Sequence, residues 1–297
     1  MLRLALFFGT NIAILALFSL VFKVLGLEQF LTSQGLGGDL TSLLIMCAFF
    51  GFAGSFISLL LSKTMAKMGT KTRIITSPST PDERWLLETV SDLAKKANIG
   101  MPEVGIFPAQ QSNAFATGWN KNKALVAVSE GLMHRFDREE VRAVLAHEIG
   151  HVANGDMVTL TLIQGVLNTF VMFFARILGS IIDKVVFKNE RGHGIGYFMI
   201  VMVLQVILGI LASIIVMWFS RWREFRADHA GAQLASRQGM IRALQKLQAE
   251  TQAHVPNQMP DTLTAFGISA GWKDTMSRLF MTHPPLEERI EALRRGL

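Results

Sequence analysis

Apolar residues are concentrated in four long stretches of this chain, and the segments between them are of mixed polarity. The stretches cover Leu4–Val24, Leu40–Leu61, Met157–Ile182 and Tyr197–Phe219. Each approaches or exceeds the roughly 20 residues that a helix needs to cross the hydrocarbon core of a bilayer. The pattern predicts a mainly α-helical membrane protein with about four hydrophobic helices.

The first two stretches predict a transmembrane hairpin. Leu4–Val24 is long and no small-x-small cleavage site follows it, which favours a retained anchor over a cleaved signal peptide. The second stretch carries a face of small residues suited to close helix packing, formed by Gly51, Gly54, Ser55 and Ser58.

The charges after the second stretch predict its orientation. No acidic residue occurs there before Asp82, whereas four basic residues do: Lys63, Lys67, Lys71 and Arg73. The positive-inside rule therefore places this segment in the cytoplasm and the loop Gly26–Asp39 on the other side. Both chain ends are then expected to be cytoplasmic.

The last two stretches allow two interpretations. Tyr197–Phe219 is apolar, with Trp218 at one end and Trp222 just beyond it as interfacial aromatic residues. Met157–Ile182 contains Arg176, which is costly against lipid. The pair is either a second transmembrane hairpin or a hairpin embedded in the membrane without crossing it.

The segment Ile74–Asp156 has the mixed polarity of a soluble α+β domain. A helix is expected over Pro81–Asn98, followed by short strands at Val104–Phe107, Ala114–Thr117 and Ala124–Ser129. We expect these strands to form a small antiparallel sheet.

One edge of this sheet is a candidate site for substrate. A sheet edge beside a catalytic metal can hold an extended peptide by backbone pairing. The candidate strand is Asn113–Thr117, with Asn113, Ala114, Phe115 and Ala116 as substrate-contacting residues. The alternative is that the sheet serves only as scaffold.

The run His147-Glu148-Ile149-Gly150-His151 has metal-binding spacing. Residues four apart on a helix differ by about 40° in azimuth and one turn in height, so both imidazoles can reach one ion. Neutral imidazole suits Zn²⁺, and Glu148 can take a proton from a zinc-bound water without ligating the metal. This is the pattern of the His-Glu-x-x-His metallopeptidases.

The surrounding residues place this run on a helix. A capping box is expected at Asp137–Glu140, and Asn154-Gly155 is a stop signal. The competing interpretation is an ordinary amphipathic helix with two surface histidines.

A catalytic zinc also needs a third protein ligand. Glu224 is a candidate because Asp228 follows it at i+4, where the aspartate can accept the N–H of a ligating histidine. The alternative is a solvated charged helix, since arginines surround the pair. Either two spans or none between His151 and Glu224 put both residues on the same side of the membrane.

The chain is therefore expected to have four parts. Residues 1–62 form an N-terminal transmembrane hairpin, and 63–156 a cytoplasmic catalytic segment. Residues 157–220 form the second hydrophobic hairpin, and 221–297 the C-terminal helical part with the third ligand.

Composition changes little in this interpretation. The chain has 297 residues, 50% hydrophobic and 18% charged, and one cysteine, so no disulfide forms within it. The net charge of +6 is concentrated beside apolar segments, where basic residues face anionic headgroups. The lipid bilayer is the expected partner, and nucleic acid is not.

These motifs together resemble one family over essentially the whole chain. They are NAFATG at 113–118, LAHEIGH at 145–151 with NGD at 154–156, REFRAD at 223–228, and THPP at 282–285 with ER at 288–289. The chain resembles the bacterial membrane-bound zinc proteases of the heat-shock and envelope-stress response. Their peptidase family also contains the CAAX prenyl-protein endopeptidases.

The resemblance implies a role for each site residue. It implies one zinc ion per chain held by His147, His151 and Glu224, with Glu148 as general base and Asp228 orienting a ligand. His283 matches the histidine that is proposed to stabilise the transition state in the prenyl endopeptidases.

The expected function is zinc-dependent endoproteolysis of misfolded or damaged membrane proteins at the cytoplasmic face of the bacterial inner membrane. A narrow-specificity peptidase like the prenyl endopeptidases is one alternative. A zinc-binding membrane scaffold or transporter without peptidase activity is the other, although few polar residues lie within the spans to form a path. The oligomeric state is left open.

Overall fold

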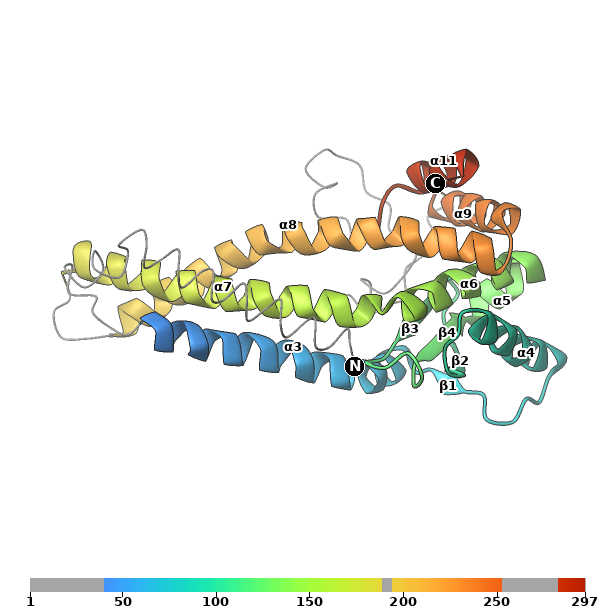
Figure 1. Cartoon of the computed structure of the whole chain (residues 1–297), viewed down its shortest axis with the longest axis horizontal. Helices are drawn as coiled ribbons and strands as arrows, with labels where there is room; N and C mark the ends of the chain where they lie inside the picture. The colour runs from blue at the N-terminus through green and yellow to red at the C-terminus, as the bar shows by residue number, and fades with distance from the viewer. Residues whose placement is uncertain (1–39, 189–193, 253–282, 297) are drawn as a thin grey trace. The chain divides into compact units, whose positions relative to one another are not determined.

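The computed structural model describes residues 40–188, 194–252 and 283–296 (Figure 1). The predicted first span Leu4–Val24 and the loop Gly26–Asp39 lie outside these residues. The chain divides into two compact units. The first, which we call the helical unit, comprises residues 1–57 and 161–213, and the second, the sheet unit, comprises 58–160 and 214–297.

Three helices in the described part of the chain are long and apolar enough to cross a membrane. They are α3 (Leu40–Thr70), α7 (Asp156–Val185) and α8 (Ile195–Leu234). They contain the second, third and fourth predicted stretches, and each is longer than its stretch. In α8 only 6% of the most apolar 18-residue window is buried, as expected for a helix surrounded by lipid.

Within the helical unit, small residues bring α3 and α7 together. A Cβ atom added at Gly51 would lie 2.7 Å from Thr169 Oγ1 and 2.8 Å from Thr169 N. One turn further along α3, Ser55 Oγ accepts a hydrogen bond of 3.4 Å from Asn168 Nδ2. The predicted small-residue face is therefore a contact surface at Gly51 and Ser55.

The sheet unit contains a four-stranded sheet in the order β1-β2-β4-β3. Its strands are β1 (Arg73–Ile74), β2 (Glu103–Phe107), β3 (Ala114–Thr117) and β4 (Leu125–Ser129). The sheet is mixed, because β2 pairs with β4 in parallel while the other two pairings are antiparallel. The prediction of an antiparallel sheet is therefore wrong for the central pairing.

The link between β2 and β3 explains the parallel pairing. The link places β3 two positions away from β2 in the sheet. The strand β4 then lies between them, parallel to β2 and antiparallel to β3. Ser129 fixes this arrangement, since its N–H donates to Asn113 O (2.9 Å) and its hydroxyl accepts from Asn113 N (2.9 Å). The strand positions follow from local apolar runs, but their order depends on this non-local pairing.

Both faces of the sheet are buried, which explains why the strands are continuously apolar. Alternate residues of β4, Val126 and Val128, belong to the main core. Leu125 and Ala127 point the other way and pack with Phe115 and Ala66, the latter on the end of α3 that lies in this unit. Lys63 and Lys67 of α3 also form ion pairs with Glu103 of β2.

The described residues of this unit also form the helices α4 (Pro81–Lys96), α5 (Glu130–Arg135), α6 (Arg138–Asn154), α9 (Arg237–Gln252) and α11 (Leu286–Arg295) (Figure 1). The capping box at Asp137 and Glu140 is confirmed at the start of α6, and Gly155 ends that helix in the left-handed conformation.

The break between α8 and α9 falls later than the sequence predicts. The apolar positions Leu234, Ile241, Leu244 and Leu247 predict one helix from Ala230 to about Gln252, but α8 continues without interruption to Leu234 and α9 starts at Arg237. Ser236 defines the new start, because its hydroxyl accepts a 2.9 Å hydrogen bond from Gly239 N–H. The later break keeps residues 221–234 on one rigid helix.

Candidate metal centre

Helix α6 presents two histidines to one point in the buried interior of the sheet unit. His147 and His151 lie one turn apart and both are buried. Their Nε2 atoms are 3.2 Å apart. The predicted helical spacing therefore brings both imidazoles to a common position.

The third candidate ligand arrives from α8. Glu224 Oε2 lies 3.6 Å from His147 Nε2, and Glu224 Oε1 lies 3.2 Å from His151 Nε2. Glu224 is fully buried. The solvated-helix alternative is therefore wrong for this side chain, and a ligand atom from each of the three residues lies within 4.8 Å of the other two.

Small residues allow the two helices to come this close. A Cβ added at Gly150, between the two histidines, would lie 2.8 Å from Ala230 Cβ of α8. A Cβ added at Gly231 would lie 3.4 Å from His147 N. Any larger side chain at Gly150 would push α8 away and withdraw Glu224 from the histidines.

Each histidine has a carboxylate beside its other ring nitrogen. His151 Nδ1 is 2.7 Å from Asp156 Oδ2, in hydrogen-bond geometry. His147 Nδ1 lies 2.9 Å from Asp228 Oδ1, at ion-pair distance but outside hydrogen-bond geometry. Because a carboxylate only accepts, these contacts favour protons on Nδ1 and leave the Nε2 lone pairs directed at the common position.

Arg289 of α11 fixes Asp228 in turn. Its Nε donates to Asp228 Oδ2 (2.7 Å) and its Nη2 donates to Asp228 Oδ1 (2.6 Å). Its Nη1 lies 3.3 Å from Glu224 Oε2. Sequence reasoning gave Arg289 no role, although it is a charged residue on the same buried stripe of α11 as Ile290 and Leu293.

The buried charges leave an excess of negative charge. With both histidines neutral, four carboxylates and two guanidinium groups give two uncompensated negative charges, the groups being those of Glu148, Asp156, Glu224, Asp228, Arg223 and Arg289. Burial lowers the pKa of His147, but Asp228 and Glu224 raise it more strongly, and the result is a pKa of about 9. The site therefore has the potential to hold a divalent cation.

The donor set fits zinc. The raised pKa of His147 means that the carboxylates favour a positive charge between the ligand atoms, and a divalent cation can take the place of the proton. A tetrahedral ion with bonds of about 2.0–2.1 Å separates its ligand atoms by about 3.3 Å. The observed separations are 3.2, 3.2 and 3.6 Å.

Comparison with known proteins assigns the chain. A family model described as "Peptidase family M48" matches residues 81–296, which is most of the chain and includes every residue described in this section. The chain belongs to peptidase family M48.

Full-length relatives of this M48 peptidase are proteases by name. It is 66% identical over 295 residues to "Protease HtpX" of Ectopseudomonas mendocina, and 65% identical over 293 residues to "Protease HtpX" of Hahella chejuensis. Each alignment covers 99% of both chains. The predicted resemblance is confirmed, and the chain is a peptidase of a metalloprotease family.

A solved structure shares its fold. The crystal structure of S. mikatae Ste24p superposes with a TM-score of 0.63 at 20% identity, covering 97% of this chain and 67% of that one. The relatives and the three apolar helices identify this M48 peptidase as a membrane protein. The predicted fold class is confirmed except for the strand pairing.

Two further predicted site residues lie at the centre. Glu148 is buried next to His147 on α6, and its charge is one of those that raise the pKa of Arg289. His283 Nδ1 lies 2.8 Å from Glu224 Oε2, and neither ring nitrogen of His283 makes a hydrogen bond.

Arg223 is also a buried arginine, and no sequence pattern predicts its burial. The solvated-helix alternative places the arginines around Glu224 in solvent, but only 3% of Arg223 is exposed. Its Nε lies 3.9 Å from Glu224 Oε1, and neither Nε nor Nη1 makes a hydrogen bond.

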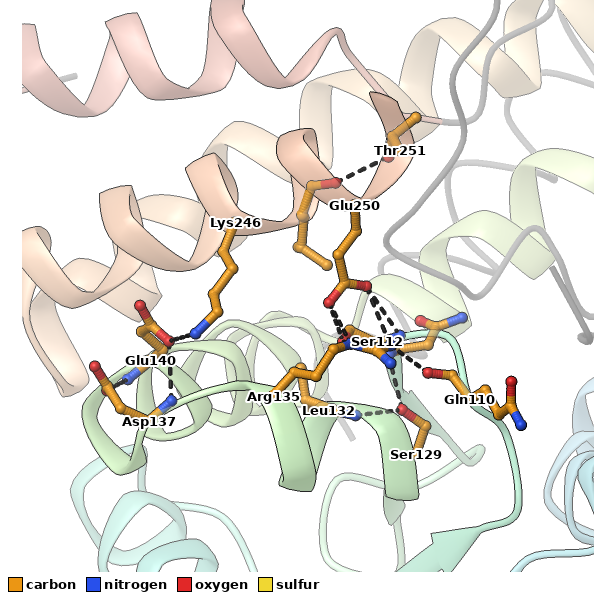
Figure 2. A network of polar contacts seen from close by, with 12 residues as sticks. Gln110, Ser112, Ser129, Leu132, Arg135, Asp137, Glu140, Lys246, Glu250 and Thr251 are labelled. Carbon is orange, nitrogen blue, oxygen red and sulfur yellow. Dashed lines mark hydrogen bonds and ion pairs between the residues drawn. The ribbon is translucent and has the colours of Figure 1, made fainter. Parts of the chain in front are cut away.

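The candidate substrate strand β3 stands at one end of the sheet order. A polar network holds the residue before Asn113 (Figure 2). Ser112 donates from N (3.3 Å) and Oγ (2.7 Å) to Glu250 of α9, and Arg135 Nε donates to the same carboxylate (2.7 Å). We call these three residues the Ser112 network.

Proposed function

We propose that this M48 peptidase is a zinc endopeptidase that hydrolyses peptide bonds of misfolded or damaged membrane proteins. It acts at the cytoplasmic face of the bacterial inner membrane, as part of membrane protein quality control under stress. The observation that carries the proposal is the buried convergence of His147, His151 and Glu224 with Glu148 beside it. The name of its relatives, "Protease HtpX", supports it.

His147, His151 and Glu224 hold one zinc ion per chain in this proposal. When bound, zinc supplies a Lewis acid that polarises the peptide carbonyl and lowers the pKa of water toward about 7. Asp156 and Asp228 keep the histidine protons on Nδ1, so that both Nε2 atoms remain ligands.

Glu148 moves the protons of the reaction. It accepts one from the attacking water and delivers it to the nitrogen of the leaving amine. His283, at 2.8 Å from Glu224, donates to the carbonyl oxygen as negative charge develops there.

The substrate backbone pairs with β3 in this proposal. Asn113 O accepts from Ser129 N–H on the β4 side, so in the alternating antiparallel pattern Ala114 and Ala116 direct their backbone groups outward. Asn113 Oδ1 already accepts from Ala114 N–H (2.8 Å), so Ala116 is the position that pairs with substrate in this proposal. Asn113 to Ala116 thus provide a short backbone template.

The decisive variant is Glu148→Gln. It removes the proton acceptor and keeps the size of the side chain, so we expect zinc to remain bound while cleavage falls at least about 10³-fold. Metal analysis and cleavage of an unfolded membrane protein measure the two effects. Glu139→Gln is the matched control, since Glu139 is on the same helix and exposed. Wild-type cleavage by Glu148→Gln would refute the role of base.

Narrow processing is the second candidate function, favoured by the structural similarity to Ste24p. Cleavage of an unfolded, unprenylated membrane protein distinguishes broad proteolysis from processing of prenylated substrates. A scaffold without peptidase activity would bind zinc and cleave neither substrate.

The four-part division of the chain, at residues 62, 156 and 220, is part of the proposal, with residues 157–220 crossing the membrane twice. After Cys47 is replaced, a single cysteine at exposed Lys188 is expected to react only from the periplasm, and one at exposed Lys121 only from the cytoplasm. Labelling of both positions from one side would exclude the second transmembrane hairpin.

A further inference from the structure

Arg223 is a buried cation, and two of its three nitrogen atoms have no hydrogen-bond partner in the part of the chain that the structure describes. Its residue is 3% exposed, and the enclosed Nε and Nη1 atoms have no hydrogen-bond partner. Arg223 forms an ion pair with Glu224. The distance from Arg223 Nε to Glu224 Oε1 is 3.9 Å, which is beyond hydrogen-bond range.

The other buried arginine of the metal centre, Arg289, shows how a buried guanidinium is normally hydrogen-bonded. Its Nε and Nη2 donate hydrogen bonds of 2.7 and 2.6 Å to Asp228. Burying guanidinium N–H groups without hydrogen-bond partners destabilises the fold. The unpaired N–H groups of Arg223 are therefore available to donate to an oxygen atom of a bound ligand.

The position of Arg223 identifies that oxygen. Glu224 Oε1, 3.9 Å from Arg223 Nε, is 3.2 Å from His151 Nε2, so the unused donors stand next to the atoms that converge in the centre. His283 and Arg289 contact the other oxygen of the same carboxylate. A peptide carbonyl that reacts at this centre comes within reach of Arg223.

We propose that Arg223 is a catalytic residue that donates hydrogen bonds to the scissile carbonyl oxygen as it becomes an oxyanion. The proposal rests on the proposed peptidase function. Water forms a bond to the carbonyl carbon, the electron pair of the C=O bond moves to the oxygen, and the proton of the water goes to Glu148. When the C–N bond breaks, the oxygen's pair re-forms the C=O bond, the C–N pair goes to the nitrogen, and Glu148 passes the proton to that nitrogen. The attraction between Arg223 and this oxygen is strongest while the oxygen is negative.

Arg223→Gln and Arg223→Lys test this in the full-length zinc-loaded enzyme in detergent. Loss of one such donor typically lowers kcat by about 10²–10³-fold, and we expect this for Gln with KM changed by less than about threefold. Lys keeps the charge and part of the donor set, so its loss is smaller. Zinc content stays at one ion per chain in both variants.

Inhibitor affinity separates a catalytic role from a structural one. The probe is a substrate peptide whose scissile amide is replaced by a phosphinate, which carries a tetrahedral anionic oxygen. We expect its Ki to rise by the same factor by which kcat/KM falls in Arg223→Gln and Arg223→Lys. Arg226→Gln, an exposed arginine stacked on Trp222 of the same helix, is the control and is expected to change neither quantity.

Two results would overturn the assignment. The first is an unchanged phosphinate Ki in Arg223→Lys despite slower cleavage. The second is loss of zinc from both Arg223 variants but not from Arg226→Gln, which would make Arg223 a support for Glu224. If the wild-type chain binds the phosphinate through Arg223 but cleaves no peptide, the proposed function fails and the binding site remains.

Discussion

The metal centre and the Ser112 network are both polar clusters inside the sheet unit, but they treat their hydrogen-bonding groups differently. In the Ser112 network, Glu250 accepts from Ser112 and Arg135, and no side-chain atom is enclosed without a partner (Figure 2). Among the described residues, the enclosed side-chain atoms that lack a hydrogen bond belong, with the exception of Thr117 Oγ1, to the metal centre.

The difference separates stabilisation from function. A satisfied network fixes α9 to the start of β3 and needs nothing more. The centre keeps nitrogen lone pairs, carboxylate oxygens and guanidinium donors in position for groups that arrive later. These unpaired groups lower the free energy of unfolding of the protein without ligands, and binding of metal and substrate raises it again.

The largest expected effect comes from removing a ligand. Glu224→Gln replaces the carboxylate that faces both Nε2 atoms, so zinc affinity is expected to fall at least about 100-fold and cleavage to become undetectable. Metal analysis after dialysis against a chelator measures this. Glu250→Gln is the control, because it alters a carboxylate of the Ser112 network. Retention of zinc by Glu224→Gln would disprove its role as ligand.

A smaller loss is expected when the orienting carboxylate is neutralised. Asp228→Asn weakens the restraint on His147 and leaves Arg289 without its anion, so zinc affinity falls about 10–100-fold. Breaking a buried ion pair on one side also lowers the free energy of unfolding by about 3–5 kcal/mol. Chelator competition and thermal unfolding of the metal-free chain give the two values. An effect on unfolding without one on zinc would make Asp228 purely structural.

Breaking the Ser112 network is expected to affect stability alone. Glu250→Gln weakens charged hydrogen bonds of a partly exposed group, at a cost of about 1 kcal/mol in unfolding free energy. Zinc content is expected to be unchanged, as measured in the same chelator assay. If zinc affinity fell as in Asp228→Asn, the two clusters would be coupled and the contrast between them would not hold.

The smallest effect concerns a carboxylate far from the centre along the sequence. Ser79 N–H, Arg73 and Ser79 Oγ donate to Glu83 and lower its pKa to about 2, against about 4.3 in an unfolded chain. A depressed pKa stabilises the fold above pH about 4.3, and the contribution disappears as pH falls to about 2. The unfolding midpoint of Glu83→Gln should lie below wild type at pH 7 and approach it near pH 2–3. A difference independent of pH would contradict this.

The parts of the fold set by local pattern were predictable from the sequence. The three described apolar helices, the strand positions and the α6 capping box follow from periodicity and end signals. The parallel pairing of β2 with β4 does not, because it depends on contacts between residues distant along the chain. The helix start after Ser236 has a local cause, the capping hydroxyl, that the apolar periodicity does not reveal.

The same limit applies to the candidate site. His147 and His151 are identified by spacing within one helix, and Glu224 only by its relation to Asp228. Arg289 and Arg223 are ordinary charged residues in the sequence, and their importance comes from burial that α8 and α11 create together. Site residues that lie on one helix can be predicted from their spacing, whereas residues brought together from several helices cannot.

The junction of α6 and α7 has a thermodynamic consequence. Gly155 alone separates them, and Asp156, the first residue of the long apolar helix, holds His151 at 2.7 Å. A bilayer that stabilises the first turn of α7 therefore also stabilises the orientation of the His151 imidazole, because Asp156 belongs to that turn. Linkage then requires reciprocity: to the extent that lipid improves retention of the ion, the ion improves retention of the helix in lipid by the same factor.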